Sequence, residues 1–176
     1  MEELYLKKIE LSDEEMVSSY LSELVCSSGG IKGFRFDDGL DFKGLIKRLN
    51  EYENIKFTSY EQASYPSYQF MLVRRIDNKA VGAVEIRPHL TKHLDLDFEG
   101  NIGYSVSASE RGKGYATIAM KLAMEEFYKL NKTDDIVMCC YKENIGSKKV
   151  ILKFGGELIE EVSGVLTAQK YLIKRS

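Results

Sequence analysis

The sequence predicts one domain, residues 1–176, of the α/β (α+β) class, with about six to seven strands and about four helices. The main observation is an alternation of two patterns. Short apolar runs of strand length are interspersed with segments in which apolar residues recur every three or four positions, as in an amphipathic helix. In addition, the length of 176 residues is too short for two ordinary domains of roughly 100 to 150 residues each.

The N-terminal part of the chain predicts one strand and two helices. Residues 4–9 form a short apolar strand, and the acidic sequence 12–15 that follows is typical of a helix start. Helical spacing continues over residues 16–25 and stops at the Ser-Ser-Gly-Gly sequence 27–30. A second amphipathic helix is predicted over residues 42–49.

A β-hairpin and a third strand are predicted next. Residues 69–76 and 79–87 have strand patterns, and the turn sequence Asp77-Asn78 separates them. The third strand is predicted at residues 101–107. It leads into the strongest helical pattern of the chain, and the apolar residues of that helix, which we expect in the core, are Ala116, Ala119, Met120, Ala123, Phe127 and Leu130.

The C-terminal part predicts three strands and one helix. Residues 136–141 are almost continuously apolar, which is typical of a strand covered on both faces. Residues 144–154 form the helix, and Gly155-Gly156 ends it at a left-handed cap. The last two strands are predicted at residues 157–162 and 165–173.

Composition excludes several classes of protein. The 25 Lys and Arg residues against 27 Asp and Glu give a net charge of −2, which does not favour a nucleic-acid-binding surface. Cys26, Cys139 and Cys140 lack CxxC spacing, so neither a disulfide framework nor a zinc knuckle is indicated. A cytoplasmic location is the simplest expectation. Because no signal peptide and no apolar run of about 18 residues is visible, no membrane partner is expected.

The segment with the most specific chemistry is residues 111–116, between the third strand and the strong helix. The first N–H groups of a helix lack intrahelical partners and carry partial positive charge, so they favour an anion such as phosphate. Two glycines allow close backbone approach, and Arg111 and Lys113 add positive charge. The alternative is an ordinary glycine-rich turn with two solvated cations. A Walker loop is excluded, because Tyr115 follows Gly114 where that motif needs Lys and then Ser or Thr. A dinucleotide-binding fingerprint is excluded as well, because the third small residue of its GxGxxG pattern is missing.

Arg111, Gly114 and Ala116 fit the pattern Arg-x-x-Gly-x-Ala. At this point the sequence resembles the GNAT superfamily of acyl-CoA-dependent N-acetyltransferases, whose pyrophosphate-binding turn has Gln or Arg, two residues, Gly, one residue, then Gly or Ala. Residues 102–106 look like the family's preceding strand, and residues 144–156 look like its asparagine-bearing second helix. The resemblance covers the chain from about residue 69 to the end well and residues 1–62 loosely, and it is nearest to bacterial proteins described as predicted acetyltransferases.

The resemblance implies a mixed, mostly antiparallel central sheet flanked by helices, whose splayed central strands form a cleft for acetyl-CoA as co-substrate. Main-chain groups of the third strand would pair with the pantetheine arm, and a backbone donor near Val106 would stabilise the tetrahedral oxyanion. The residues implied to bind the cofactor are Tyr104, Ser105, Val106, Arg111, Gly112, Lys113, Gly114, Tyr115, Ala116, Asn144 and Ser147.

Direct acetylation of an amine needs a base and an acid. An alkyl ammonium with a pKa of about 10.4 must lose a proton before attack, and the departing thiolate must gain one. Glu85, in an otherwise apolar strand, is the predicted base, with a solvent-facing edge carboxylate as the open alternative and Glu99 as a second candidate. The tyrosine acid frequent in the family falls on Ile151, which cannot serve. Tyr141 is the predicted replacement, and its alternative is a rim aromatic that packs on the cofactor arm.

Two further pairs of residues are candidate reactive groups. His89 and His93 are four apart, but no third ligand with metal spacing is visible, so loop histidines are favoured over a metal site, and either is a possible base. Cys139 and Cys140 face opposite sides of a strand, so at most one faces the cleft. Apolar packing is favoured over an acyl-cysteine intermediate for both.

The sequence thus predicts an acyltransferase that moves an acetyl group from acetyl-CoA to a primary amine of a small molecule or peptide in a ternary complex. A non-catalytic acyl-CoA-binding or regulatory module is the alternative. Residues 111–153 hold 9 basic and 5 acidic residues, whereas residues 1–62, on the expected acceptor side, hold 8 and 13, which favours a cationic acceptor. A homodimer is compatible with the resemblance, since dimers are frequent in the family.

Overall fold

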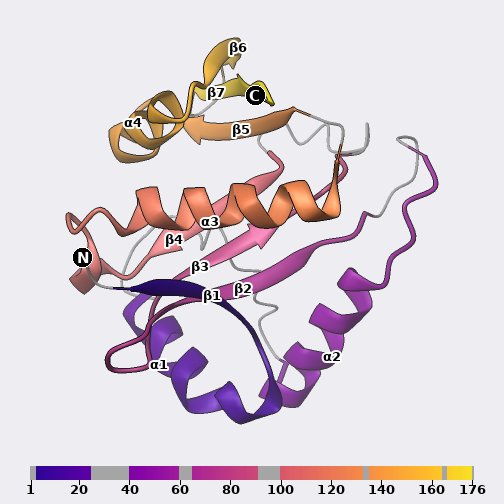
Figure 1. Ribbon diagram of the computed structural model, residues 1–176, viewed down its shortest axis with the longest axis vertical. Coiled ribbons are helices and arrows are strands. Elements are labelled where there is room, and N and C mark those ends of the chain that lie inside the picture. The colour runs from indigo at the N-terminus through magenta and orange to yellow at the C-terminus, as the bar shows by residue number, and fades with distance from the viewer. Residues whose placement is uncertain are drawn as a thin grey trace.

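The computed structural model describes residues 3–24, 40–59, 65–90, 100–132, 135–163 and 166–175. They form two antiparallel sheets, with strand orders β1-β2-β3-β4 and β5-β7-β6, as Figure 1 shows. The strands are β1 (Leu4–Lys8), β2 (Tyr68–Arg74), β3 (Lys79–Ile86), β4 (Ile102–Val106), β5 (Ile136–Tyr141), β6 (Glu157–Val162) and β7 (Ala168–Ile173). The α-helices are α1 (Glu14–Leu24), α2 (Phe42–Glu53), α3 (Tyr115–Leu130) and α4 (Ile145–Lys153), and the short 3-10 helices are η1 (Leu11–Asp13) and η2 (Ala108–Glu110).

The four-stranded sheet separates two helical layers (Figure 1). Successive residues of a strand face opposite sides of a sheet. Leu72 and Val84 therefore pack in the core that contains α3, whereas Met71, Val73 and Ala83 pack in the core that contains α1 and α2. This layering decides on which side of the sheet each side chain of the candidate site lies.

The predicted apolar stripe of α3 is confirmed as core. Ala119, Met120, Ala123 and Phe127 have no exposed surface, and they pack with residues of both sheets. Burying Phe127 stabilises the fold by about 1.5–3 kcal/mol relative to leaving it exposed. α3 has 16 residues, and no helix within the described ranges is long and apolar enough to cross a membrane.

The three-stranded sheet differs from the expectation in one respect. Ile136, Met138 and Cys140 of β5 are buried, whereas the residues between them are only half-buried. One face of β5 is therefore fully covered by the core, and the other face, which the prediction also covers, is only half-buried. The predicted left-handed cap is confirmed at Gly155, whose φ is 80°.

The two sheets meet where β4 and β5 begin, and Asn101 joins them. Its backbone N–H donates to the carbonyl of Val137 (2.7 Å), and its side-chain Oδ1 accepts from the N–H of Val137 (2.7 Å). Beyond this junction the described residues of β4 and β5 form no ladder. The splay that the resemblance implies for these strands is therefore present, with Asn101 at its closed end.

Gly100 allows the close approach of the two strands at this junction. A Cβ atom at Gly100 would lie 2.6 Å from the carbonyl oxygen of Val137 and 3.0 Å from Cα of Met138, both backbone atoms. Gly100→Ala is therefore expected to lower the free energy of unfolding by about 1–3 kcal/mol in a urea titration. The control is Gly146→Ala in α4, where the added atom meets only Asn144 Oδ1 at 3.6 Å, and where stability should hold or rise. Equal midpoints for Gly100→Ala and the unmodified chain would contradict this role.

Candidate functional site

The turn between η2 and α3 presents unpaired backbone N–H groups. Gly112 and Gly114 have φ of 79° and 82°, in the left-handed region, and a Cβ atom at either would meet nothing within 4 Å. Backbone conformation, and not space, is therefore what requires glycine here. The N–H groups of Gly112, Lys113, Gly114 and Ala116 donate to no described residue. Together with the positive end of α3, they form an arrangement suited to the oxygens of a phosphate.

The two cations of this turn differ in their contacts. Lys113 Nζ lies 2.7 Å from Oε2 of Glu110, a carboxylate that is only 4% exposed. Arg111 is exposed, and its Nε donates to the carbonyl of Val106 (3.3 Å). It forms no ion pair with a carboxylate of the described residues. Arg111 thus has a charge that no carboxylate balances, next to the free N–H groups.

The backbone of β4 has a free edge toward β5. The N–H of Ser107 donates to the carbonyl of Val81 on β3 (3.0 Å), which fixes the phase of the antiparallel ladder. Hydrogen-bonded pairs alternate in such a ladder with pairs whose backbone groups point outward. This alternation directs the N–H and C=O groups of Tyr104 and Val106 toward the diverging β5, whereas those of Ser105 face β3. Of the three main-chain partners expected for the cofactor arm, Tyr104 therefore keeps both backbone groups available and Val106 keeps its N–H, because its carbonyl accepts from Arg111.

Three of the expected cofactor-binding residues lie together at the start of α4. The hydroxyl groups of Tyr104 and Ser147 are 3.1 Å apart, so a hydrogen bond connects β4 with α4 across the splay. Asn144 is the N-cap of α4, and its Oδ1 accepts from the N–H of Ser147 (3.0 Å). Burial raises the pKa of Tyr104 above its ordinary value. Asn144 thus holds the helix start in place and is itself an exposed residue.

Glu85 lies in a buried polar cluster. It is 4% exposed on β3, which β2 and β4 flank on both sides, so the alternative of a solvent-facing edge carboxylate is wrong. Its Oε1 accepts from Ser67 Oγ (2.6 Å), and its Oε2 lies 3.9 Å from Nη2 of Arg87. Gln69, directly opposite on β2, is buried as well. A carboxylate with hydrogen-bonding partners is tolerated at such a position, which an isolated one would not be.

The side of the sheet on which Glu85 lies is the side of α1 and α2. Ala83, two residues earlier, belongs to the core with these helices, and strand alternation places Glu85 on the same face. Gly103 is directly opposite Glu85 on β4 and has no side chain. Ser105 is on this face too, and its Oγ lies 2.6 Å from the hydroxyl of Tyr20 in α1. Burial raises the pKa of Tyr20 to about 12, so its hydroxyl remains protonated near neutral pH.

The remaining predicted residues of the site are less closely tied to it. Tyr141 ends β5 half-buried, and its carbonyl accepts from the N–H of Asn144 (2.9 Å). Ile151 has no exposed surface and packs against Gly156, so its position is filled by the core and supplies no acid. Cys140 is buried in the same core, as expected for a packing residue, while Cys139 is half-buried.

Of the two loop histidines and the second candidate base, the structure describes only His89. The ring of His89 stacks on Phe57, with ring centroids 4.1 Å apart. His93 and Glu99 lie outside the described residues. Within the described ranges, no group of three or more His, Cys, Asp or Glu side chains could hold a metal ion.

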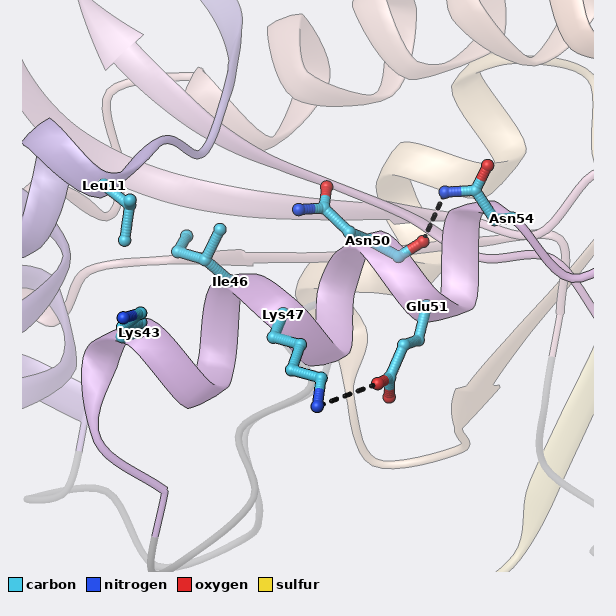
Figure 2. A pocket seen from close by; sticks show the side chains of 7 residues that line it. All are labelled: Leu11, Lys43, Ile46, Lys47, Asn50, Glu51 and Asn54. Carbon is cyan, nitrogen blue, oxygen red and sulfur yellow. Dashed lines mark hydrogen bonds and ion pairs between the residues drawn. The ribbon is translucent and has the colours of Figure 1, made fainter.

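A surface groove of about 460 Å³ lies along the outer face of α2 (Figure 2). It is lined by Leu11, Lys43, Ile46, Lys47, Asn50, Glu51 and Asn54. The polar groups there largely serve the helix itself: Lys47 pairs with Glu51 (3.9 Å), and the side chain of Asn54 donates to the carbonyl of Asn50 (2.7 Å). None of the predicted site residues lines this groove, so it is separate from the site built around β4.

Sequence reasoning missed the partners of Glu85 and Ser105. Ser67 lies in a turn-rich stretch before the predicted strand 69–76, Arg87 ends the predicted strand 79–87, and Tyr20 belongs to the predicted helix over residues 16–25. Gln69 is a polar residue within a strand that is otherwise apolar, and this pattern was the available signal for a buried polar cluster around Glu85. No signal for Tyr20 exists in the sequence, because its partner is 85 residues away.

Comparison with known proteins agrees with this geometry. The family profile described as "Acetyltransferase (GNAT) domain" matches residues 40–157. The chain is 26% identical over 152 residues to the probable N-acetyltransferase YjcK of Bacillus subtilis (strain 168), covering 86% of this chain and 79% of that protein.

Two solved structures show the same fold. The ribosomal-protein-S5-alanine acetyltransferase from Vibrio fischeri superposes with a TM-score of 0.68 at 15% identity, covering 98% of this chain and 93% of that one. Mutant forms of the spermidine/spermine N-acetyltransferase SpeG from Vibrio cholerae give a TM-score of 0.64 at 13% identity, with 97% and 92% covered. At these identities the likeness shows the fold alone. The family profile, however, matches well over half of the chain, and the chain therefore belongs to the GNAT family of acetyltransferases.

Proposed function

We propose that the protein transfers the acetyl group of acetyl-CoA to a primary amine by direct attack in a ternary complex. The observation that carries the proposal is the juxtaposition of a phosphate-compatible turn, the free edge of β4 and a buried carboxylate on the adjacent strand. In the reaction, the amine nitrogen forms a bond to the acetyl carbon and the carbon–sulfur bond breaks. Family membership supports acetyl transfer, and we propose specific residues for cofactor binding, for the base and for the acid.

The cofactor is proposed to lie along β4. The N–H groups of Gly112, Lys113, Gly114 and Ala116 and the charge of Arg111 would hold the pyrophosphate. The outward N–H and C=O of Tyr104 and the N–H of Val106 would pair with the pantetheine arm. An extended peptide binds to the edge of a sheet through main-chain hydrogen bonds, and the pantetheine arm, which is linear and carries amide groups, can bind to the edge of β4 in the same way. The N–H of Val106 is then the donor nearest the thioester oxygen, where it would stabilise the oxyanion.

Glu85 is proposed as the base. It is on the sheet face of α1 and α2, the N-terminal part of the chain that is expected to contribute the acceptor side. Ser67 fixes its Oε1 at 2.6 Å, so the carboxylate has a defined orientation from which Oε2 can receive a proton, directly or through one water. Gly103, directly opposite Glu85 on β4, adds no side chain beside the carboxylate.

Tyr141 is proposed as the acid that protonates the thiolate. Tyr141 lies four residues beyond Val137 along β5, which at about 3.3 Å per residue is about 13 Å from the junction. Val106 lies five residues beyond Asn101 along β4, which is about 16 Å from the junction. The two positions are therefore at a similar depth in the splay. The phenol O–H of Tyr141 is a hydrogen-bond donor that could pass its proton to the thiolate.

A cationic amine is the acceptor class that the chain favours. The net charge of residues 1–62 is −5, and a negative field attracts an ammonium group. Neighbouring folds bear the names of a spermidine/spermine acetyltransferase and of an acetyltransferase of an alanine of ribosomal protein S5, and both names specify amine acceptors. A cytoplasmic location also belongs to the proposal, since the spacing of the three cysteines indicates no disulfide framework.

Calorimetric titration with acetyl-CoA tests the proposal. We expect saturable binding with a dissociation constant in the range of about 1 μM to 1 mM, as is usual for enzyme substrates. Release of the CoA thiol should then accelerate in a screen of polyamines, amino acids, aminoglycosides and peptide N-termini. No binding at millimolar acetyl-CoA would refute the cofactor assignment. Binding without turnover on any amine would leave the non-catalytic acyl-CoA module as the better description.

A further inference from the structure

Glu110 is a buried carboxylate immediately before the cofactor turn, and three cations surround it. It is the last residue of η2 and is 4% exposed. Its Oε2 lies 2.7 Å from Lys113 Nζ and 3.0 Å from Arg74 Nη1, and its Oε1 lies 3.4 Å from Lys79 Nζ. The contact with Lys113 lowers the pKa of Glu110 most, against burial, which acts in the opposite direction. The carboxylate is therefore charged near neutral pH and holds groups from three segments together.

The contact between Glu110 and Lys113 closes a loop around Gly112. These two residues are three apart, and Gly112 between them has a φ of 79°. Glycine samples positive and negative φ almost equally, so two such glycines leave a turn with little intrinsic preference for one shape. The link from Glu110 to Lys113 supplies that preference, because the carboxylate is fixed from the other side by Arg74.

Arg74 anchors this arrangement to the body of the protein. It ends β2, its guanidinium is also bound by Asp77 (2.6 Å), and its Nη1 donates to the hydroxyl of Tyr115 (3.3 Å). Tyr115 is the first residue of α3 and is buried. Both ends of the turn, Glu110 before it and Tyr115 after it, are thus tied to the same arginine of the sheet.

We propose that Glu110 is a positioning residue for acetyl-CoA: it acts through Lys113 and Arg74 to hold turn 111–114 in the shape in which the N–H groups of residues 112–114 receive the pyrophosphate. Lys113 then serves mainly to close the turn, and Arg111 is the cation that meets phosphate oxygens. This inference rests on the proposed function and adds to it a residue that does not itself contact the ligand. Preorganisation of this kind raises affinity because the turn does not have to be ordered upon binding.

The test measures the affinity of CoA for a set of variants by calorimetry. Glu110→Gln keeps the size of the side chain and removes its charge, and we expect the dissociation constant to rise about ten-fold. Glu110→Asp keeps the charge and should lose less affinity. The matched control is Glu126→Gln on α3, because Glu126 also contacts a lysine three residues away at 2.7 Å but lies far from the turn. The control should bind as the unmodified chain does.

A double variant separates positioning from direct contact. Lys113 is half-exposed, so Lys113→Met should fold even if Glu110→Gln is unstable. If Glu110 acts through Lys113, each single variant and the double variant weaken CoA binding to a similar extent. Equal or tighter binding by Glu110→Gln, or additive losses in the double variant, would overturn the inference while leaving the proposed function intact. Absence of CoA binding by the unmodified chain would overturn both.

Discussion

Glu85→Gln is expected to lower kcat for acetyl transfer about a hundred-fold or more, while the dissociation constant for acetyl-CoA changes less than about two-fold. The substitution preserves shape and removes the group that accepts the proton. Its amide still hydrogen-bonds to Ser67, which lies 2.6 Å from Oε1, so the buried cluster should remain packed. Steady-state kinetics with the best amine of the screen, together with calorimetry, give the two quantities.

Ser67→Ala is the matched control for this prediction. It removes the hydrogen bond that orients the carboxylate and leaves the carboxylate in place, so we expect a loss in kcat of less than about ten-fold. Thermal unfolding of both variants shows whether the fold is intact. If Glu85→Gln retained more than about a third of the original kcat, the buried carboxylate would be a structural member of the cluster and the base would have to be sought elsewhere.

The parts of the site that local sequence determines were predictable. Gly112 and Gly114 take left-handed backbone conformations within a few residues of each other, and the helix start that follows them is local as well. The splay was implied only by the resemblance, since its closed end depends on Asn101 meeting Val137, which lies 36 residues further on. Nothing in the local sequence predicts that Asn101 connects the two sheets.

The environment of Glu85 depended on topology that the sequence does not contain. An apolar strand with one carboxylate is compatible with an edge strand and with a central strand, and only the pairing of β3 with both β2 and β4 decides between them. Similarly, Lys113 and Glu110 are near neighbours in sequence, but the burial of Glu110 follows from Arg74 at the end of another strand. Long-range pairing of charged side chains is therefore the part that the sequence could not specify.

Tyr141→Phe is expected to reduce kcat by about a hundred-fold and to leave the affinity for acetyl-CoA nearly unchanged. The variant keeps the ring and so retains any packing against the cofactor arm. It removes only the hydroxyl that would protonate the departing thiolate. Ile151, at the family's usual tyrosine position, is fully buried and supplies no acid. Tyr141, at the end of β5, is therefore the phenol that we propose for the sulfur.

Tyr104→Phe provides the comparison that makes this assignment decisive. Its hydroxyl is bound to Ser147 at 3.1 Å and connects β4 with α4, so its loss should weaken acetyl-CoA binding a few-fold and leave kcat nearly constant. A large loss of kcat in Tyr104→Phe, with Tyr141→Phe fully active, would move the acid from β5 to β4 and make Tyr141 a rim aromatic. Because burial raises the pKa of Tyr104, its phenol is protonated at neutral pH, so protonation state alone does not exclude Tyr104 as the acid. The positions of the two tyrosines decide between them: the Tyr104 hydroxyl is engaged with α4, while Tyr141 ends β5 at nearly the same depth as Val106, where the thioester is proposed to lie.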